Sequence, residues 1–361
     1  MPISDYFSPD YASARERFRA AAAAAGAEWQ EYPLAAHLGP HGERLGIDVA
    51  RLGDADATRA LVLISGTHGV EGLCGSGCQV GYLGDRLFRA LPAPSCALLI
   101  HALNPHGFAW LRRVTEDNVD LNRNFVDFDQ ALPAAPAYEE LHPWLLPATW
   151  EGDARSQADA ALLAYAQRHG MRALQSAVSG GQYSRPDGLF FGGRQPTWSA
   201  RTLRQILAEQ LPRAVQRVAV IDVHTGLGPP GYGEPILVPC SPADTERARR
   251  WYGPGVKDLS AGESVSAQLQ GTLAAGFRAA LPAAELTFIG LEFGTRPMQE
   301  VLTALRADHW VHAHRPTDLR LREAAQQQMR AAFYTDDSAW QAAVYGRMAD
   351  YVYRACRGLG A

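Results

Sequence analysis

Two residues with metal-binding side chains, His68 and Glu71, stand three positions apart in the glycine-bracketed segment GTHGVEG. Imidazole nitrogens and carboxylate oxygens are common ligands of Zn²⁺. A His-x-x-Glu pair arises by chance about once in a chain of this composition, so the spacing alone is weak evidence. Its position is more informative, because the pair follows the apolar run 60–65 and ligand sites in open α/β sheets form beyond the carboxyl ends of strands.

A second histidine, His224, follows another apolar run, 217–223, in RVAVIDVHTGLG. Two histidines and one carboxylate at the same sheet edge would supply three ligands for Zn²⁺ and leave a fourth position for water. Such a water becomes a nucleophile near neutral pH. We therefore predict one zinc ion per chain, bound by His68, Glu71 and His224.

A carboxylate, Glu292, ends the apolar run of LTFIGLEFGTRP. Burying a carboxylate costs several kcal/mol unless it is paired or used. Beside a zinc-bound water, Glu292 could accept a proton and pass it to the leaving amine. We predict that it is the general base and acid of a hydrolytic site.

The segment 102–125 contributes further polar side chains: Arg112, Arg113, Asp120, Asn122 and Arg123. One arginine could bind a substrate carboxylate through two parallel hydrogen bonds, and another could stabilise an oxyanion. Asp120 could orient a metal-bound histidine through its far ring nitrogen. The alternative is a solvated loop in which Glu116 and Asp117 pair with the arginines.

The elements that must position these residues follow from the apolar patterning. Runs without polar alternation are typical of strands covered on both faces, and they span 60–65, 97–103, 217–223 and 286–291. Alternating segments at 29–34 and 46–52 indicate edge strands. Helical stretches at 154–177, 200–215 and 317–334 separate them. This predicts a three-layer α/β fold, with a mixed, mostly parallel sheet and helices on both faces.

The chain is interpreted as one catalytic domain, 1–361, with an insertion at about 127–199 that shapes the cleft. Its net charge of −4 argues against nucleic-acid and membrane-surface partners. The N-terminal segment is too short and too weakly apolar for a signal peptide or membrane span. Five cysteines without paired spacing favour a reducing compartment, so we expect a cytoplasmic protein.

Five motifs, taken in order, resemble those of the zinc carboxypeptidase superfamily, which includes aspartoacylase and succinylglutamate desuccinylase. The motifs are GTHGVEG, NPHG, DLNRNF, DVHTG and LEFGT. The similarity is greatest to a bacterial branch of unknown function. It covers most of the chain, and its motifs follow in order from about residue 60 to 296. It implies that His68, Glu71 and His224 bind zinc, that Glu292 is the general base, and that Arg113 polarises the scissile carbonyl. It also implies that Asp120 orients His68, and that Asn122 and Arg123 hold a substrate carboxylate. Arg112 is a further candidate for substrate binding.

Three functions are therefore weighed. A metallocarboxypeptidase is preferred over an N-acyl amino acid deacylase, because the deacylases usually append a small β domain where residues 300–361 are predicted to be helical. The alternative from another class is a non-catalytic peptide- or metal-binding module, but metal binding alone requires neither Glu292 nor Arg113. Peptides or N-acyl amino acids are the expected substrates, and the oligomeric state is left open.

Two smaller questions concern individual residues. The substrate-capping tyrosine of the superfamily has two candidates, Tyr183 and Tyr232, which stand in glycine-rich loops. The histidine-rich segment HWVHAH contains His309, His312 and His314, which we interpret as helix-end or surface residues rather than as a metal site.

Overall fold

Eight strands form a single mixed sheet in the part of the chain that the structure, a computed structural model, describes: residues 2–239 and 241–361. The strands are β1 (Glu28–Leu38), β2 (Arg44–Gly53), β3 (Arg59–Ile64), β4 (Ser95–His101), β5 (Arg217–Pro230), β6 (Gly233–Leu237), β7 (Lys257–Asp258) and β8 (Glu285–Gly294). Their order across the sheet is β1-β2-β4-β3-β5-β8-β6-β7.

The centre of the sheet is parallel and its flanks are mixed. Strands β4, β3, β5 and β8 run parallel to one another, β1, β2 and β6 pair antiparallel with a neighbour, and β7 pairs parallel with β6. The four strands predicted to be covered on both faces are these four central ones. One prediction is wrong, because β2 is not an edge strand: it lies between β1 and β4 and is buried over most of its length.

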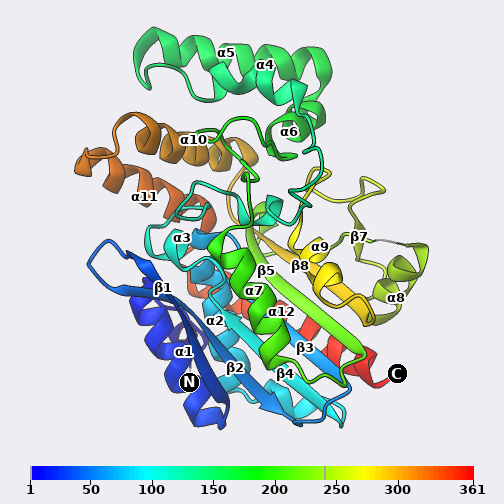
Figure 1. The fold of residues 1–361 in the computed structure, drawn as a ribbon. Helices are drawn as coiled ribbons and strands as arrows, with labels where there is room; N and C mark the ends of the chain where they lie inside the picture. Colours follow the sequence, from blue (N-terminus) through cyan, green and yellow to red (C-terminus); the bar gives the residue numbers. More distant parts are fainter. Residues whose placement is uncertain (1, 240) are drawn as a thin grey trace.

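Helices cover both faces of the sheet, as predicted (Figure 1). One face carries α1 (Tyr11–Ala25), α2 (Gly72–Gly84), α8 (Pro242–Tyr252) and α12 (Ser338–Gly360), whose apolar side chains share one core with the sheet. The other face carries α7 (Trp198–Gln210) and α9 (Leu273–Ala280), which pack on a second core. The short α3 (Pro105–Ala109) follows β4.

A third apolar cluster lies among the helices that Figure 1 shows above the sheet. It joins α4 (Pro136–Leu145), α5 (Gly152–His169) and α6 (Met171–Ser179) to α10 (Met298–His314) and α11 (Leu319–Phe333). The predicted helix 154–177 is two helices, because the chain turns at Gly170 with a positive φ of 90°. Residues 300–361 are helical, as predicted.

No helix within the described residues is both long enough and apolar enough to cross a membrane.

Candidate metal and catalytic site

His68 and Glu71 lie in a tight turn at the carboxyl end of β3. Glu71 belongs to the 3₁₀ turn Gly69–Glu71, and His68 is its N-cap residue. The turn needs its glycines: Gly66 has a φ of 65°, and a Cβ on Gly69 would lie 2.0 Å from the backbone of Gly107. The chain therefore leaves β3 close against α3, and both His68 and Glu71 are buried.

His224 and Glu292 reach the same place from neighbouring parallel strands. They are directly paired in the register of β5 and β8, so their side chains lie on the same face of the sheet. Strand β5 extends well beyond the predicted end at residue 223, which carries His224 past the end of β3. Register, rather than sequence spacing, places the histidine beside the carboxylate.

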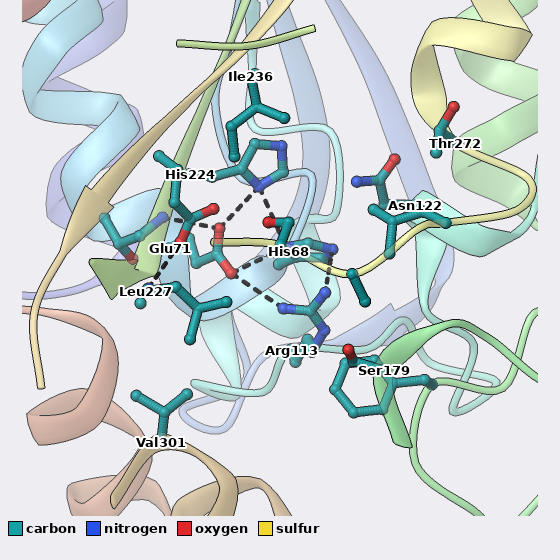
Figure 2. A pocket seen from close by; sticks show the side chains of 18 of the residues that line it. His68, Glu71, Arg113, Asn122, Ser179, His224, Leu227, Ile236, Thr272 and Val301 are labelled. Atoms are coloured by element: carbon teal, nitrogen blue, oxygen red, sulfur yellow. Dashed lines mark hydrogen bonds and ion pairs between the residues drawn. The ribbon is translucent and has the colours of Figure 1, made fainter. Parts of the chain in front are cut away.

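The distances among His68, Glu71 and His224 fit a shared metal ion. The Nδ1 atoms of the two histidines are 3.2 Å apart, and they lie 2.9 Å and 3.0 Å from Oε1 and Oε2 of Glu71 (Figure 2). Ligand bonds of about 2.1 Å in a tetrahedral zinc site separate neighbouring ligands by about 3.4 Å. Within the described residues, these three form the only such cluster of potential ligands.

The far ring nitrogens of both histidines face carboxylates. His224 Nε2 lies 2.6 Å from Asp222 Oδ2, and His68 Nε2 lies 3.2 Å from Asp120 Oδ1. A proton on each Nε2 leaves the lone pair of each Nδ1 free for a metal. Asp222 is in turn held by the hydroxyl of Thr67, at 2.7 Å.

Arg113 contacts the same histidine and carboxylates. Its Nη2 is 2.8 Å from His68 Nε2, its Nε is 2.9 Å from Asp120 Oδ2, and its Nη1 is 3.3 Å from Glu71 Oε1. Arg113 Nη2 and Asp120 Oδ1 both contact His68 Nε2, and they need opposite protonation states of that nitrogen. If a metal binds Nδ1, Nε2 carries the ring proton and donates it to Asp120. Nη2 of Arg113 then loses this partner and is free to donate into the cavity.

The two glutamates have opposite electrostatic environments. Burial opposes ionisation of Glu71, but His68 and His224 hold its pKa well below the ordinary value. Burial, reinforced by the negative charge of Glu71, raises the pKa of Glu292 to about 7. The Glu292 carboxylate accepts the backbone N–H of Leu227, at 3.0 Å, and lines the cavity. A carboxyl group with this pKa is suited to exchanging protons near neutral pH.

Arg123 is a buried cation whose donors are only partly used. Its Nε and Nη2 donate to the carbonyl of Ser179 at the end of α6, and its Nη1 donates to the carbonyl of Asn122. These contacts occupy both sides of the guanidinium and leave its Nη1/Nη2 end free. Among the described residues no carboxylate forms an ion pair with Arg123. The Asn122 side chain accepts the N–H of Leu273 and borders the same cavity.

The structure places Arg112 away from the other predicted site residues. Its Nε is 2.9 Å from Asp308 Oδ2 in α10, its Nη2 is 3.1 Å from Asn118, and it does not line the cavity. The prediction that Arg112 binds substrate is therefore not supported by its position. Its backbone carbonyl accepts the N–H of Val70, so this ion pair ties α10 to the turn that carries Glu71.

Replacement of Asp308 by Asn is expected to destabilise the fold by about 3 kcal/mol, because it leaves the Arg112 charge buried without its partner. Urea unfolding followed by circular dichroism would measure the loss. Glu300→Gln, at an exposed position of the same helix, is the matched control and should change stability by less than about 0.5 kcal/mol. Equal effects of the two substitutions would show that the ion pair contributes little.

One other prediction, for His309, is wrong. His309 is not a surface residue: it is 2% exposed in α10 and lies near Asp308 with His312, whereas His314 is exposed. Neither tyrosine candidate lines the cavity. The Tyr183 hydroxyl donates to the carbonyl of Arg123, and Tyr232 is 42% exposed.

Seven of the predicted site residues border one cavity of ≈ 1190 Å³, counted with the solvent at its mouth. His68, Glu71, Arg113, Asn122, Arg123, His224 and Glu292 line it. Much of the remaining wall is apolar and comes from α6, β6, β8, α10 and α11.

Asp222 is a site residue that the sequence analysis missed. The signal was present in DVH, since residues two apart in a strand point to the same face. Ser179 and Asp308 carried no such signal, because their contacts span 56 and 196 positions of sequence.

Comparison with solved structures finds distant similarity of fold. Carboxypeptidase A from Helicoverpa armigera is 13% identical, with a TM-score of 0.43, over 90% of this chain and 74% of that one. An aspartoacylase family protein from Mesorhizobium loti is 14% identical, with a TM-score of 0.36, over 79% and 67%. Glutaminyl cyclase from Fimbriiglobus ruber is 8% identical, with a TM-score of 0.40, over 98% and 91%.

The comparison with curated proteins finds no match. Residues 7–347 match the family described as protein of unknown function (DUF2817), which agrees with the predicted resemblance to a bacterial branch of unknown function. Because the match covers nearly the whole chain, the protein belongs to the DUF2817 family.

Proposed function

We propose that this protein is a zinc-dependent hydrolase that cleaves an amide bond in a small substrate bearing a carboxylate, and that it acts as a metallocarboxypeptidase. The observation that carries the proposal is the convergence of two Nδ1 atoms and one carboxylate, with a further carboxylate on the far nitrogen of each ring. Glu292, paired in register with His224, adds a proton acceptor that metal storage would not require.

The residues divide the reaction among them. A Zn²⁺ held by His68, Glu71 and His224 would supply Lewis acidity for the carbonyl and acidify a water molecule. Glu292 takes a proton from the attacking water and delivers it to the leaving nitrogen. Arg113, released from His68, donates to the carbonyl oxygen as negative charge develops there.

The substrate carboxylate is assigned to Arg123 and Asn122. The Nη1 and Nη2 atoms of Arg123 have further N–H groups that can donate two parallel hydrogen bonds. Asp120 attracts the Arg123 charge, but among the described residues no carboxylate forms a direct ion pair with it. Asn122 borders the same space, and its side-chain nitrogen has no hydrogen-bond partner within the part of the chain that the structure describes.

Arg123→Lys is expected to raise KM for a carboxylate-bearing substrate by about 10- to 100-fold, because lysine cannot donate two parallel hydrogen bonds. The same substrate with its carboxylate converted to an amide serves as the comparison, and its kcat/KM should differ little between the two proteins. An equal loss with both substrates would contradict the assignment of Arg123.

The rate should fall in acid because protonated Glu292 cannot accept a proton. The pKa of Glu292 is about 7 without metal, and a bound cation would lower it toward the ordinary value of 4.5. We expect kcat/KM to decrease tenfold per pH unit below a pKa within that interval. The pH dependence of kcat/KM, measured for the wild type and for the residual activity of Glu292→Gln, would test this. If the variant shows the same decrease in acid, another group is responsible for that decrease.

An N-acyl amino acid deacylase is the second candidate, since Arg123 would hold the carboxylate of either substrate. The helices α10–α12 fill the C-terminal region where the resembling deacylases carry a β domain, which favours the peptidase. Dipeptides and N-acyl amino acids that share one C-terminal residue would separate the two. Metal-loaded protein that binds both without turnover would instead support a binding module.

A further inference from the structure

Part of the cavity wall beside Glu292 is apolar. Six apolar side chains from β5, α10 and α11 form it: Leu227, Met298, Val301, Leu302, Leu305 and Phe333, called here the acyl wall. The four residues from α10 follow the spacing i, i+3, i+4, i+7, so they belong to one face of that helix. No member of the acyl wall is ionisable.

The acyl wall borders the catalytic carboxylate directly. A Cβ on Gly226 would lie 3.3 Å from the Phe333 ring and 3.5 Å from Glu292 Oε1, so ring and carboxylate flank the same glycine. The hydroxyl of Thr225 donates to the carbonyl of Phe333, at 2.7 Å, which fixes the end of α11 against β5. Leu227 carries the N–H that binds Glu292.

Two residues of the wall lie across the metal-ligand cluster from Asn122, the residue that precedes Arg123. Figure 2 shows Asn122 and Thr272 on one side of His68, Glu71 and His224, with Leu227 and Val301 on the other. A substrate held by its carboxylate at Arg123, with its amide carbonyl at the cluster, must extend its acyl portion toward the acyl wall.

The wall also presents apolar surface to the cavity. Leu227, Met298 and Leu302 are only partly buried, although they line an internal cavity. Apolar surface of this kind in a concave site is typical of pockets that bind apolar ligands. The metal-ligand residues are 4%, 1% and 6% exposed, so the substrate must be a small molecule or a thin chain end.

We propose that the acyl wall selects substrates whose acyl side carries an apolar group larger than a methyl. This rests on the proposed function and deepens it. The group would be the side chain of the penultimate residue of a peptide or the acyl chain of an N-acyl amino acid, and both sources present the same chemistry to the wall.

The test uses the full-length, zinc-loaded protein and a matched series with one C-terminal amino acid. Acetyl, butanoyl, hexanoyl and octanoyl conjugates form one arm, and dipeptides with Gly, Ala or Leu at the N-terminal position form the other. Hydrolysis gives kcat/KM, and calorimetric titration of the slowly hydrolysing Glu292→Gln protein with the same compounds gives Kd.

We expect Kd to decrease by about fourfold per added methylene until the wall is covered, and kcat/KM to rise in parallel. Leu302→Trp should shorten the preferred group, lowering kcat/KM for the octanoyl compound at least tenfold more than for the acetyl compound. Thr303→Trp, one position along α10 and outside the cavity lining, is the matched control and should leave the series unchanged.

The outcomes separate this inference from the proposed function. If hydrolysis is robust, and neither kcat/KM nor Kd depends on the acyl group in the conjugates or the dipeptides, the inference is wrong and the proposed hydrolase function remains supported. Binding that strengthens with chain length without any turnover would support the wall and contradict the hydrolase. A response of the two Trp variants that is equal for all compounds would show that the wall does not select substrates.

Discussion

Glu292→Gln is expected to lower kcat by about 10²- to 10⁴-fold while zinc remains bound, since an amide cannot accept the proton of the attacking water. The substitution preserves the side-chain oxygen that accepts the N–H of Leu227. It also removes a partly buried negative charge beside Glu71, so the thermal stability of the metal-free protein should stay the same or increase. Steady-state kinetics and zinc analysis of the zinc-loaded protein, with a melting curve of the metal-free protein, measure all three.

The most informative control is a carboxylate of similar chemistry outside the catalytic position. Glu234 is buried on β6, directly across from Glu292 in the antiparallel register, and its carboxylate binds Ser264 and Val265. Glu234→Gln should retain most of the turnover. Full activity in Glu292→Gln, or equal losses in both variants, would contradict the role of Glu292 as the general base.

His224→Ala is expected to abolish high-affinity zinc binding together with turnover, because it leaves two ligands of a three-ligand set. It also removes the imidazole whose Nε2 lies 2.6 Å from Asp222. Dialysis against a weak chelator followed by elemental analysis should give about one zinc per wild-type chain and little in the variant.

His314→Ala is the matched control, because His314 is an exposed histidine at the end of α10. It should leave the zinc content and the activity unchanged. Retention of zinc by His224→Ala, with loss in His314→Ala, would move the metal to the histidine-rich segment and contradict the site.

The strand pattern predicted much of the fold because β3, β4, β5 and β8 are buried on both faces and therefore appear as continuous apolar runs. The same pattern fixed where His68, His224 and Glu292 emerge, since parallel strands end at one edge of a sheet. The sequence did not show that β2 is an interior strand, because the polar residues Asp48 and Arg51 interrupt its apolar run. Asp48 is buried by pairing with Arg15 and Arg19 of α1.

The rest of the site depends on contacts between distant segments. Sequence could not show that Arg112 turns to Asp308 whereas Arg113 turns to His68, because adjacent arginines have the same local chemistry. It also could not place the Ser179 carbonyl against Arg123, since α6 ends there only after the chain breaks at Gly170. Tertiary packing, rather than local pattern, decides these assignments.

The central claim is that one zinc ion binds between His68, Glu71 and His224. Anomalous diffraction at the zinc absorption edge, from crystals of the zinc-loaded protein, tests it most directly. We predict a single peak per chain about 2.0–2.2 Å from the two Nδ1 atoms and a Glu71 oxygen. A peak elsewhere in the chain, or none at this position in protein that contains stoichiometric zinc, would contradict the account.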